Sequence, residues 1–419
     1  MRTAIRIPDR YTIALVLIIV SMCMGVEFFG SYQPTRLLLI FFFFLYFPNI
    51  LRNKLSYSLD QPILIGVLLF IVWIVYGTIS LLWSPDPIVG LKSELIVMGI
   101  GFLSLPVCFY FTKKIENPLL LLRKGWRNCF FITAVIGLIE LITWKHLPSS
   151  GPNEVLGGVG VAVPHASATF GNVNDYGAFI VFVIPYLLWG ILDEKQLKNK
   201  APYMVALLMG ILIVVVNGSR MGMFVIAFQI LWFLVPIIRK TKRIHFLGGI
   251  FVLSIMISFL PLEKLFYTMN YRLGAFATGD ESSSERLAMI KSGLEMLKGS
   301  YGVGVGAGGF EKSVIHQPSF LGNIVNPHNL FVEVFAQYGI IIFVLFCFWL
   351  FSILYYAQKN KQLSEGASNA ISLTIVALPC IGIMSSHSLG YTYLWLFLCC
   401  ATVISAYRPM EKNGVSKSK

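Results

Sequence analysis

Long runs of apolar residues, separated by short polar turns, cover most of the chain. Each run is long enough to cross about 30 Å of hydrocarbon as a helix. In lipid the backbone must satisfy its own hydrogen bonds, so packed helices are the expected structure. The pattern predicts about twelve transmembrane helices, at residues 11–29, 35–50, 62–83, 92–111, 128–145, 175–192, 202–218, 221–238, 245–262, 327–356, 370–387 and 389–407.

The composition agrees with this pattern. Hydrophobic residues make up 56% of the chain and charged residues 13%, whereas soluble domains contain roughly 25% charged residues. The seven cysteines fall within or beside apolar runs and lack Cys-x-x-Cys spacing. Buried thiols are therefore expected rather than disulfides or a zinc site. The fold class that follows is an all-α polytopic membrane protein.

The net charge of +13 reflects topology rather than a nucleic-acid partner. Most of the Lys and Arg residues lie in alternate turns, and the remaining short turns hold only four, namely Arg36, Lys92, Lys145 and Arg220. Since cytoplasmic turns are enriched in Lys and Arg, both termini are predicted to be cytoplasmic. The basic turns then face anionic lipid at the inner leaflet, and a nucleic-acid partner is not expected.

One segment between the ninth and tenth predicted helices is long enough to fold on its own. It divides the chain into transmembrane helices 1–9 (residues 1–262), an extracytoplasmic loop (263–326), and transmembrane helices 10–12 with a cytoplasmic tail (327–419). Within the loop, residues 283–299 predict an amphipathic helix, with Arg286 in its first turn. Its apolar face is expected to consist of Leu287, Ile290, Leu294 and Leu297.

A glycine-rich stretch, GVGVGAGGF (302–310), follows that helix. It contains the spacing Gly-x-Gly-x-x-Gly, but no strand precedes it and no helix-forming run follows at once, so a dinucleotide site is not indicated. A tight turn is expected here, whose backbone can approach another helix or a phosphate.

Two polar stretches on the predicted outer face allow two interpretations. In NPHNLFVEVF, Asn326 and Pro327 are expected to begin a helix, with His328 and Asn329 at the membrane edge and Glu333 deeper. These groups either cap and anchor the helix or form a reaction centre. Arg220, in the short turn NGSRMG, either extends towards the membrane surface or binds an anion.

Four stretches together resemble a known family. The stretches are ATFGNVNDYG, GSRMG, ERLAMIKSGLEMLKGSYGVGVGAGGF and HN followed by nine residues and glycine, here His328, Asn329 and Gly339. Their order and sidedness resemble the O-antigen ligase and O-antigen polymerase superfamily of bacterial membrane glycosyltransferases. One departure is Ile342, where a small residue is often found.

The resemblance implies a GT-C-like helical fold in the bacterial cytoplasmic membrane, with the active site on its outer face. It implies transfer of a glycan from an undecaprenyl diphosphate carrier to a sugar hydroxyl of an acceptor glycan, with inversion at the anomeric carbon. Membrane lipids and chain-length regulator proteins are the further partners it suggests. No cofactor is implied.

The chemistry of that reaction assigns roles to named residues. The diphosphate needs fixed cations, and the chain contains no Asp-x-Asp motif for a metal, so Arg220 and Arg286 are the candidates. Weaker candidates for substrate binding are Arg272, Lys291, Asn329, Glu333 and Asn174. His328 is the candidate base, since its ordinary pKa of about 6.5 suits proton transfer, or it positions the acceptor. Glu333 or Glu140 could orient it.

Three functions stay open at this point. A polymerase joins one lipid-linked repeat to another, whereas a ligase passes finished glycan to a different acceptor. The sequence NPHN and the residue Ile342 favour the polymerase. A transporter of polysaccharide or lipid is the alternative from another class, but the two halves of the chain show no evident repeat.

Overall fold

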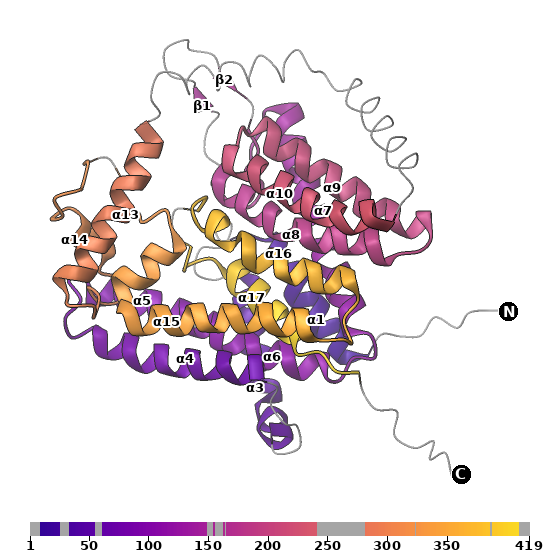
Figure 1. Cartoon of the computed structure of the whole chain (residues 1–419), viewed down its shortest axis with the longest axis horizontal. Coiled ribbons are helices and arrows are strands. Elements are labelled where there is room, and N and C mark those ends of the chain that lie inside the picture. The colour runs from indigo at the N-terminus through magenta and orange to yellow at the C-terminus, as the bar shows by residue number, and fades with distance from the viewer. Residues whose placement is uncertain are drawn as a thin grey trace.

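The computed structural model describes residues 9–25, 33–54, 61–148, 154–155, 162–163, 165–240, 281–322, 324–385 and 388–409. These residues form a bundle of helices (Figure 1), so the predicted all-α membrane class is confirmed. The helices are α1 (Arg10–Val20), α3 (Pro34–Lys54), α4 (Gln61–Ser80), α5 (Pro87–Val97), α6 (Leu103–Thr112), α7 (Pro118–Thr143), α8 (Val173–Asp193), α9 (Leu197–Val216), α10 (Arg220–Lys240), α13 (Glu281–Gly299), α14 (Phe310–Val314), α15 (Leu330–Lys359), α16 (Glu365–Gly382) and α17 (Thr392–Ser405).

Three short elements complete the description. A 3-10 turn (Ser21–Cys23) extends α1, and a π-helical turn (Met98–Phe102) joins α5 to α6 into one continuous helix. The two-residue strands β1 (Glu154–Val155) and β2 (Ala162–Val163) pair antiparallel.

Six of the described helices are long and apolar enough to cross a membrane: α4, the continuous α5–α6, α7, α8, α9 and α15. Shorter apolar helices form at Arg10–Cys23, Pro34–Ile50, Arg220–Leu234 and Thr392–Ser405. Each predicted span overlaps a helix, except 245–262, which lies outside the described residues. The chain is a multi-pass membrane protein.

Two helices, α8 and α17, lie in the interior of the bundle. All residues of α8 from Asp175 to Gly190 are buried, and α8 packs against α7, α9, α10 and α16. A helix that is apolar on every side is expected to be surrounded by others. The rings of Trp126 (α7) and Phe397 (α17) stack at 3.7 Å between centroids. By contrast, α4, α9 and α15 each keep one apolar face exposed, as lipid-facing helices do.

The turns of the bundle gather at two ends. At one end, which we call the short-turn end, residues 113–117, 194–196, 360–364 and 406–409 connect or follow the helices. The Asn360 side chain donates to the carbonyls of Ser405 (3.0 Å) and Tyr407 (2.8 Å). Buried Arg123 contacts Asp193 at 3.5 Å and also pairs with Glu194.

The other end, which we call the loop end, carries the other connections that the structure describes, including the longest, 300–329. These connections are 21–25, 81–86, 144–148, 165–172, 217–219, 300–329 and 383–391. Hydrogen bonds join several of them to one another, as between Asn217 and Ala166. Successive turns therefore lie at opposite ends of the bundle, in the same alternation that the distribution of basic residues predicted.

The helix α13 differs from the prediction in two respects. It begins at Glu281, so Arg286 lies not in its first turn but in its second, where the helix dipole disfavours a cation less strongly. Its buried face is not the leucine face either, because Leu287 and Leu294 are each 53% exposed, whereas Met289 and Met296 are 2% exposed.

Small residues explain which face of α13 is buried. A Cβ on Gly293 would lie 2.5 Å from Cγ1 of Val332 in α15, so the two helices approach more closely than a leucine face allows. The residues of α13, α14 and α15 then share a separate apolar cluster, formed by Met289, Met296, Phe310, Val314, Val332 and Ala336. This cluster fixes the loop helices against the start of α15.

Candidate active site

The start of α15 carries the histidine motif. The helix begins at Leu330, and the Asn329 side chain caps it by accepting the N–H groups of Phe331 (3.0 Å) and Val332 (3.2 Å). The expectation that Asn326 and Pro327 begin the helix is therefore wrong, because the asparagine that caps most effectively stands three residues later. His328 precedes the cap with φ of 43°, a left-handed backbone that costs a non-glycine residue roughly 1–2 kcal/mol.

A kink interrupts α15 at Gly339, the glycine of the same motif. Its φ of 74° and ψ of −177° are not helical. The kink exposes carbonyls, which accept hydrogen bonds from the glycine-rich stretch: Val305 N donates to Ala336 O (2.8 Å) and Gly306 N to Gln337 O (3.0 Å). A Cβ on Gly339 would lie 2.4 Å from Val303 O. The expected close approach of this backbone to a helix is thus confirmed.

The opposite side of the glycine-rich stretch is attached to α4 and the turn that follows it. Tyr76 donates to Val303 O (2.6 Å) and Trp83 Nε1 to Gly304 O (3.1 Å). Ser84 Oγ donates to Ala307 O (2.7 Å). The stretch is therefore held between α4 and the kinked α15, and it sets how the loop docks on the bundle.

An ion pair supports this attachment at the surface. Lys312 Nζ of α14 lies 2.7 Å from Oδ2 of Asp86, the residue that caps α5. The Lys312 ammonium, together with the N–H of Val89, lowers the pKa of Asp86 below its ordinary value.

The turn between α16 and α17, residues 388–391 with Ser385, connects helices from distant parts of the chain. Asp175 at the start of α8 accepts Ser385 Oγ (2.8 Å) and the hydroxyl of Tyr391. Glu333 of α15 accepts the N–H of Leu389 (3.2 Å). Arg36 of α3 donates to Gly390 O (3.0 Å). Sequence reasoning predicted none of these contacts, although Asp175 stands within the FGNVNDYG stretch.

The turn that bears Arg220 meets the start of α15 through the end of α16. A Cβ on Gly222 would lie 3.3 Å from Cε of Met384, and one on Gly382 would lie 2.9 Å from Cβ of Leu330. The end of α16 therefore lies between the Arg220 turn and Leu330, the residue two positions after His328. Arg220 is half-buried as the first residue of α10.

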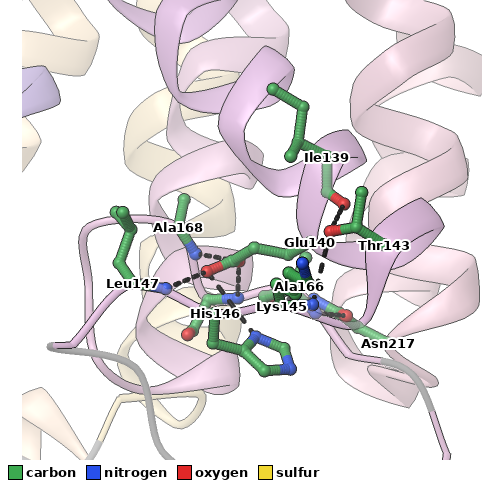
Figure 2. Close-up of polar contacts among 10 residues, drawn as sticks. Ile139, Glu140, Thr143, Lys145, His146, Leu147, Ala166, Ala168 and Asn217 are labelled. Atoms are coloured by element: carbon green, nitrogen blue, oxygen red, sulfur yellow. Dashed lines mark hydrogen bonds and ion pairs between the residues drawn. The ribbon is translucent and has the colours of Figure 1, made fainter.

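The Arg220 turn is also tied to the segment before α8. Asn217 pairs with the backbone of Ala166 in both directions, at 2.8 Å each. Close by, the buried carboxylate of Glu140 accepts the N–H groups of Ser167 (3.0 Å) and Ala168 (2.7 Å). Figure 2 shows these two side chains holding one strip of irregular backbone.

Glu140 also supports a pair of histidines. His146 Nδ1 lies 3.6 Å from Oε1 of Glu140, and Figure 2 shows the imidazole beside that carboxylate. The His146 ring stacks on the ring of His165, with centroids 4.6 Å apart. Sequence reasoning named Glu140 as a group that could orient His328. In the structure its carboxylate contacts His146 and the backbone before α8.

The remaining predicted residues take the following places. Arg286 is half-buried and Lys291 exposed on α13, the helix that packs against α15. Asn174 is half-buried in the first turn of α8, where its N–H donates to the capping side chain of Asn172 (2.7 Å). Arg272 lies outside the described residues.

A cavity of about 270 Å³ opens beside the start of α15. Pro327 and Glu333 form one wall, and Glu311 and Gly308 of the loop form another. The helix α5 and the turn at Leu389 and Gly390 complete it. The cavity adjoins His328, since Pro327 is the residue before it.

Backbone strain is confined to the loop end of the described chain. Its non-glycine residues with positive φ are Trp144, Ala168, Tyr301 and His328, and its positive-φ glycines are Gly171, Gly218, Gly302, Gly304, Gly306, Gly308, Gly322 and Gly339. All belong to, or adjoin, the loop-end connections. Such conformations persist only where the surrounding structure enforces them, and they cluster at functional sites.

Comparison with known proteins finds a family match and a relative. The O-antigen ligase family matches residues 204–347, a range that contains Arg220, Arg286, His328 and Gly339. Over this range the chain is similar to the O-antigen ligase and O-antigen polymerase superfamily. It is also 25% identical to the teichuronic acid biosynthesis protein TuaE of Bacillus subtilis (strain 168), with 99% of this chain and 88% of that protein aligned.

These similarities support a coarse function. The chain is a membrane protein of polysaccharide biosynthesis, of the O-antigen ligase or polymerase type, with a glycosyltransferase-like role. The family match suggests a lipid-linked glycan in the membrane as the substrate class.

Proposed function

We propose that this protein is a polymerase that joins undecaprenyl-diphosphate-linked oligosaccharide repeats into a cell-surface polysaccharide. The observation that carries the proposal is the construction of the α15 start. There a strained His328 precedes the Asn329 cap, and the loop that bears Arg286 docks on the Gly339 kink. The similarity to a teichuronic acid biosynthesis protein favours a polymer of the cell envelope as product.

The proposed reaction is a direct displacement. The acceptor hydroxyl oxygen forms a bond to the anomeric carbon of the donor sugar, and the bond from that carbon to the diphosphate oxygen breaks. The diphosphate leaves with the electron pair, and the configuration inverts. His328 takes the proton of the hydroxyl, a contribution of typically 10²–10⁴-fold in rate.

The arginines neutralise the leaving group in this proposal. Guanidinium groups bind phosphate oxygens through paired N–H donors, so Arg220 and Arg286 hold the diphosphate as its charge develops. Fixed cations in a site shielded from water act more strongly than in solution. Lys291, Asn329, Glu333, Asn174 and Arg272 are proposed to bind the rest of the substrate.

The proposed orientation follows from the basic turns. The short-turn end faces the cytoplasm together with both termini, and the loop end faces outwards. The residues are then organised as transmembrane helices 1–9 (1–262), the outer loop (263–326) and helices 10–12 (327–419).

Purified protein in detergent with lipid-linked oligosaccharide tests the proposal. Wild type is expected to extend the glycan, also in the presence of a chelator, because the reaction is proposed to need no metal. His328→Ala, Arg286→Ala and Arg220→Ala are each expected to lose at least 100-fold in rate while remaining folded. His316→Ala, an exposed histidine of the same loop, is the matched control and keeps full activity.

The products distinguish the alternatives. In a deletion strain, accumulation of single lipid-linked repeats indicates a polymerase, and accumulation of long unattached chains indicates a ligase. If the purified protein extends no glycan but moves lipid-linked substrate across a vesicle membrane, the transporter alternative replaces the enzyme.

A further inference from the structure

Asp175 ties the α16–α17 turn to the start of α8. Its Oδ1 accepts the hydroxyl of Ser385 (2.8 Å), and its Oδ2 accepts the hydroxyl of Tyr391. Ser385 follows the end of α16, and Tyr391 is the residue directly before α17. Because Asp175 is only 2% exposed, water competes little with these two bonds. One carboxylate therefore holds the turn at both of its ends.

The start of α8 also packs against the turn that bears Arg220. A Cβ on Gly177, two positions after Asp175, would lie 3.7 Å from Oγ of Ser219 and 3.2 Å from Cε of Met384. Ser219 is the residue before Arg220. The first turn of α8 thus lies directly beside the Arg220 turn, and a shift of one is expected to displace the other, because closely packed segments transmit strain.

On its other side, the α16–α17 turn contacts the start of α15. The N–H of Leu389 donates to Oε2 of Glu333 at 3.2 Å. A Cβ on Gly382, the last residue of α16, would lie 2.9 Å from Cβ of Leu330, two positions after His328. Through this turn, Asp175 is therefore connected to the helix start that follows His328.

The proposed reaction needs Arg220 and His328 at a fixed separation. The imidazole must reach the acceptor hydroxyl while the guanidinium holds the diphosphate, and an error of about 1 Å in such a geometry can lower a rate about 100-fold. Reacting groups are held this closely only where further residues fix the segments that carry them. The contacts of Asp175 lead to the segments that carry both groups.

We propose that Asp175 is a positioning residue of the transfer reaction: it holds the α16–α17 turn against the start of α8 and so fixes the separation between the Arg220 guanidinium and the His328 imidazole. This inference rests on the proposed function. It gives the FGNVNDYG stretch a role in the geometry of the reaction, and it adds Ser385 and Tyr391, which no sequence motif connected with the reaction.

Tyr391→Phe tests the proposal with the smallest change, because it removes one hydroxyl and keeps the ring. With purified protein and lipid-linked oligosaccharide, kcat per folded molecule is expected to fall at least tenfold. The KM values of donor and acceptor are expected to change less than twofold, since the residues proposed to bind each substrate stay in place. A raised donor KM with an unchanged kcat would make Tyr391 a substrate-binding residue and overturn the proposal.

Tyr407→Phe is the matched control. It makes the same change just beyond the other end of α17, at the short-turn end, and is expected to keep full activity. Ser385→Ala frees the opposite end of the α16–α17 turn from Asp175 and is expected to reproduce the loss of kcat seen in Tyr391→Phe. Full kcat in either variant refutes the claim that Asp175 must hold the turn at both ends.

A double-mutant cycle shows whether Tyr391 acts through Asp175. In an Asp175→Ala background the hydroxyl of Tyr391 has lost this acceptor, so Tyr391→Phe is expected to change kcat less than twofold. A further tenfold loss in that background would mean that Tyr391 acts independently of Asp175, which contradicts the proposal. If Asp175→Ala does not fold, the single variants Tyr391→Phe and Ser385→Ala decide the question.

Hydrogen exchange separates this inference from the proposed function, because it needs no turnover. The amides of Met223 and Glu333 are hydrogen-bonded within the first turns of α10 and α15, at 2.9 Å each. Tyr391→Phe is expected to speed exchange at least threefold in peptides that cover both helix starts, and Tyr407→Phe in neither. Faster exchange at both starts supports the positioning role, and a change at one start or at neither refutes it. If wild type extends no glycan, the polymerase proposal fails, while this comparison still tests the inference.

Discussion

The two ends of the bundle hold their turns together by different means. At the short-turn end, regular helices finish in ordinary conformations and are joined by side chains, such as Arg123 with Asp193 and Glu194. At the loop end, backbone pairs with backbone as well as with side chains, and residues with a left-handed backbone are frequent. The difference is consistent with the proposed function, in which the short-turn end serves stability and the loop end holds a strained geometry for the reaction.

Among the variants that distinguish the two ends, Gly339→Ala is expected to have the largest effect on glycan extension. The new Cβ would stand 2.4 Å from Val303 O at a φ of 74°, so the glycine-rich stretch must move away from the kink. Glycan extension is expected to fall at least tenfold, because the loop that bears Arg286 loses its position against His328. Gly99→Ala is the control, since its Cβ would meet nothing within 4 Å. Full extension by Gly339→Ala would show that the kink is not needed for activity.

An effect on stability rather than on activity is expected for Arg123→Ala. It leaves Asp193 and Glu194 without their cation at the short-turn end. The free energy of unfolding is expected to fall by about 3 kcal/mol. This is the lower limit for a broken buried pair, and it applies because both acids are partly exposed. The melting temperature in detergent should fall, while the KM of the donor stays at the wild-type value. Lys124→Ala, one position further on and exposed, should change neither quantity. A raised donor KM would contradict the separation of the two ends.

Glu140→Gln is expected to have an intermediate effect at the loop end. The neutral side chain weakens the bonds from the N–H groups of Ser167 and Ala168, at a cost of about 1–2 kcal/mol. The segment before α8 and the Arg220 turn then shift together, and extension falls a few-fold. Thr143→Ala serves as control, since its hydroxyl bonds to Ile139 O within the same helix. The shift is expected to appear as faster proteolysis of the loop end in Glu140→Gln than in wild type.

The smallest effect concerns pH and the Asp86–Lys312 ion pair. The folded protein lowers the pKa of Asp86. The ion pair therefore contributes its full stabilisation at pH values above 3.8, the ordinary pKa of this carboxyl group. That stabilisation is lost as the pH falls through the lower pKa of the folded state. Asp86→Asn should therefore leave thermal stability at neutral pH nearly unchanged, as is usual for exposed pairs. A loss of stability at neutral pH comparable to that of Arg123→Ala would refute this ranking.

Local patterns in the sequence were sufficient to predict the helices and the close backbone approach at the glycine-rich stretch. Apolar runs predicted the spans because the length and composition of a membrane helix are local properties. The glycine-rich stretch predicted a close backbone approach for the same reason. The partner in that approach, Gly339, stood in the histidine motif, but nothing around it indicates a kink.

The errors arose where packing overrides the local pattern. Leucine spacing predicted one face of α13, but Gly293 and the methionines are buried against α15 instead. Asp175 and Tyr391 are joined across 216 positions, and no local signal reports such a pair. The cavity lining likewise combines α5 with residues more than 200 positions later. Contacts of this kind depend on the whole fold and are not written in any one stretch.

In the proposed function, the loop end binds the diphosphate of the carrier lipid through Arg220 and Arg286 beside His328. The most direct test is an experimental structure of the full chain with a bound polyprenyl diphosphate. Both guanidinium groups are expected within hydrogen-bond distance of the phosphate oxygens, with the imidazole facing the same space. A diphosphate bound at the short-turn end, or one that contacts neither arginine, would contradict it.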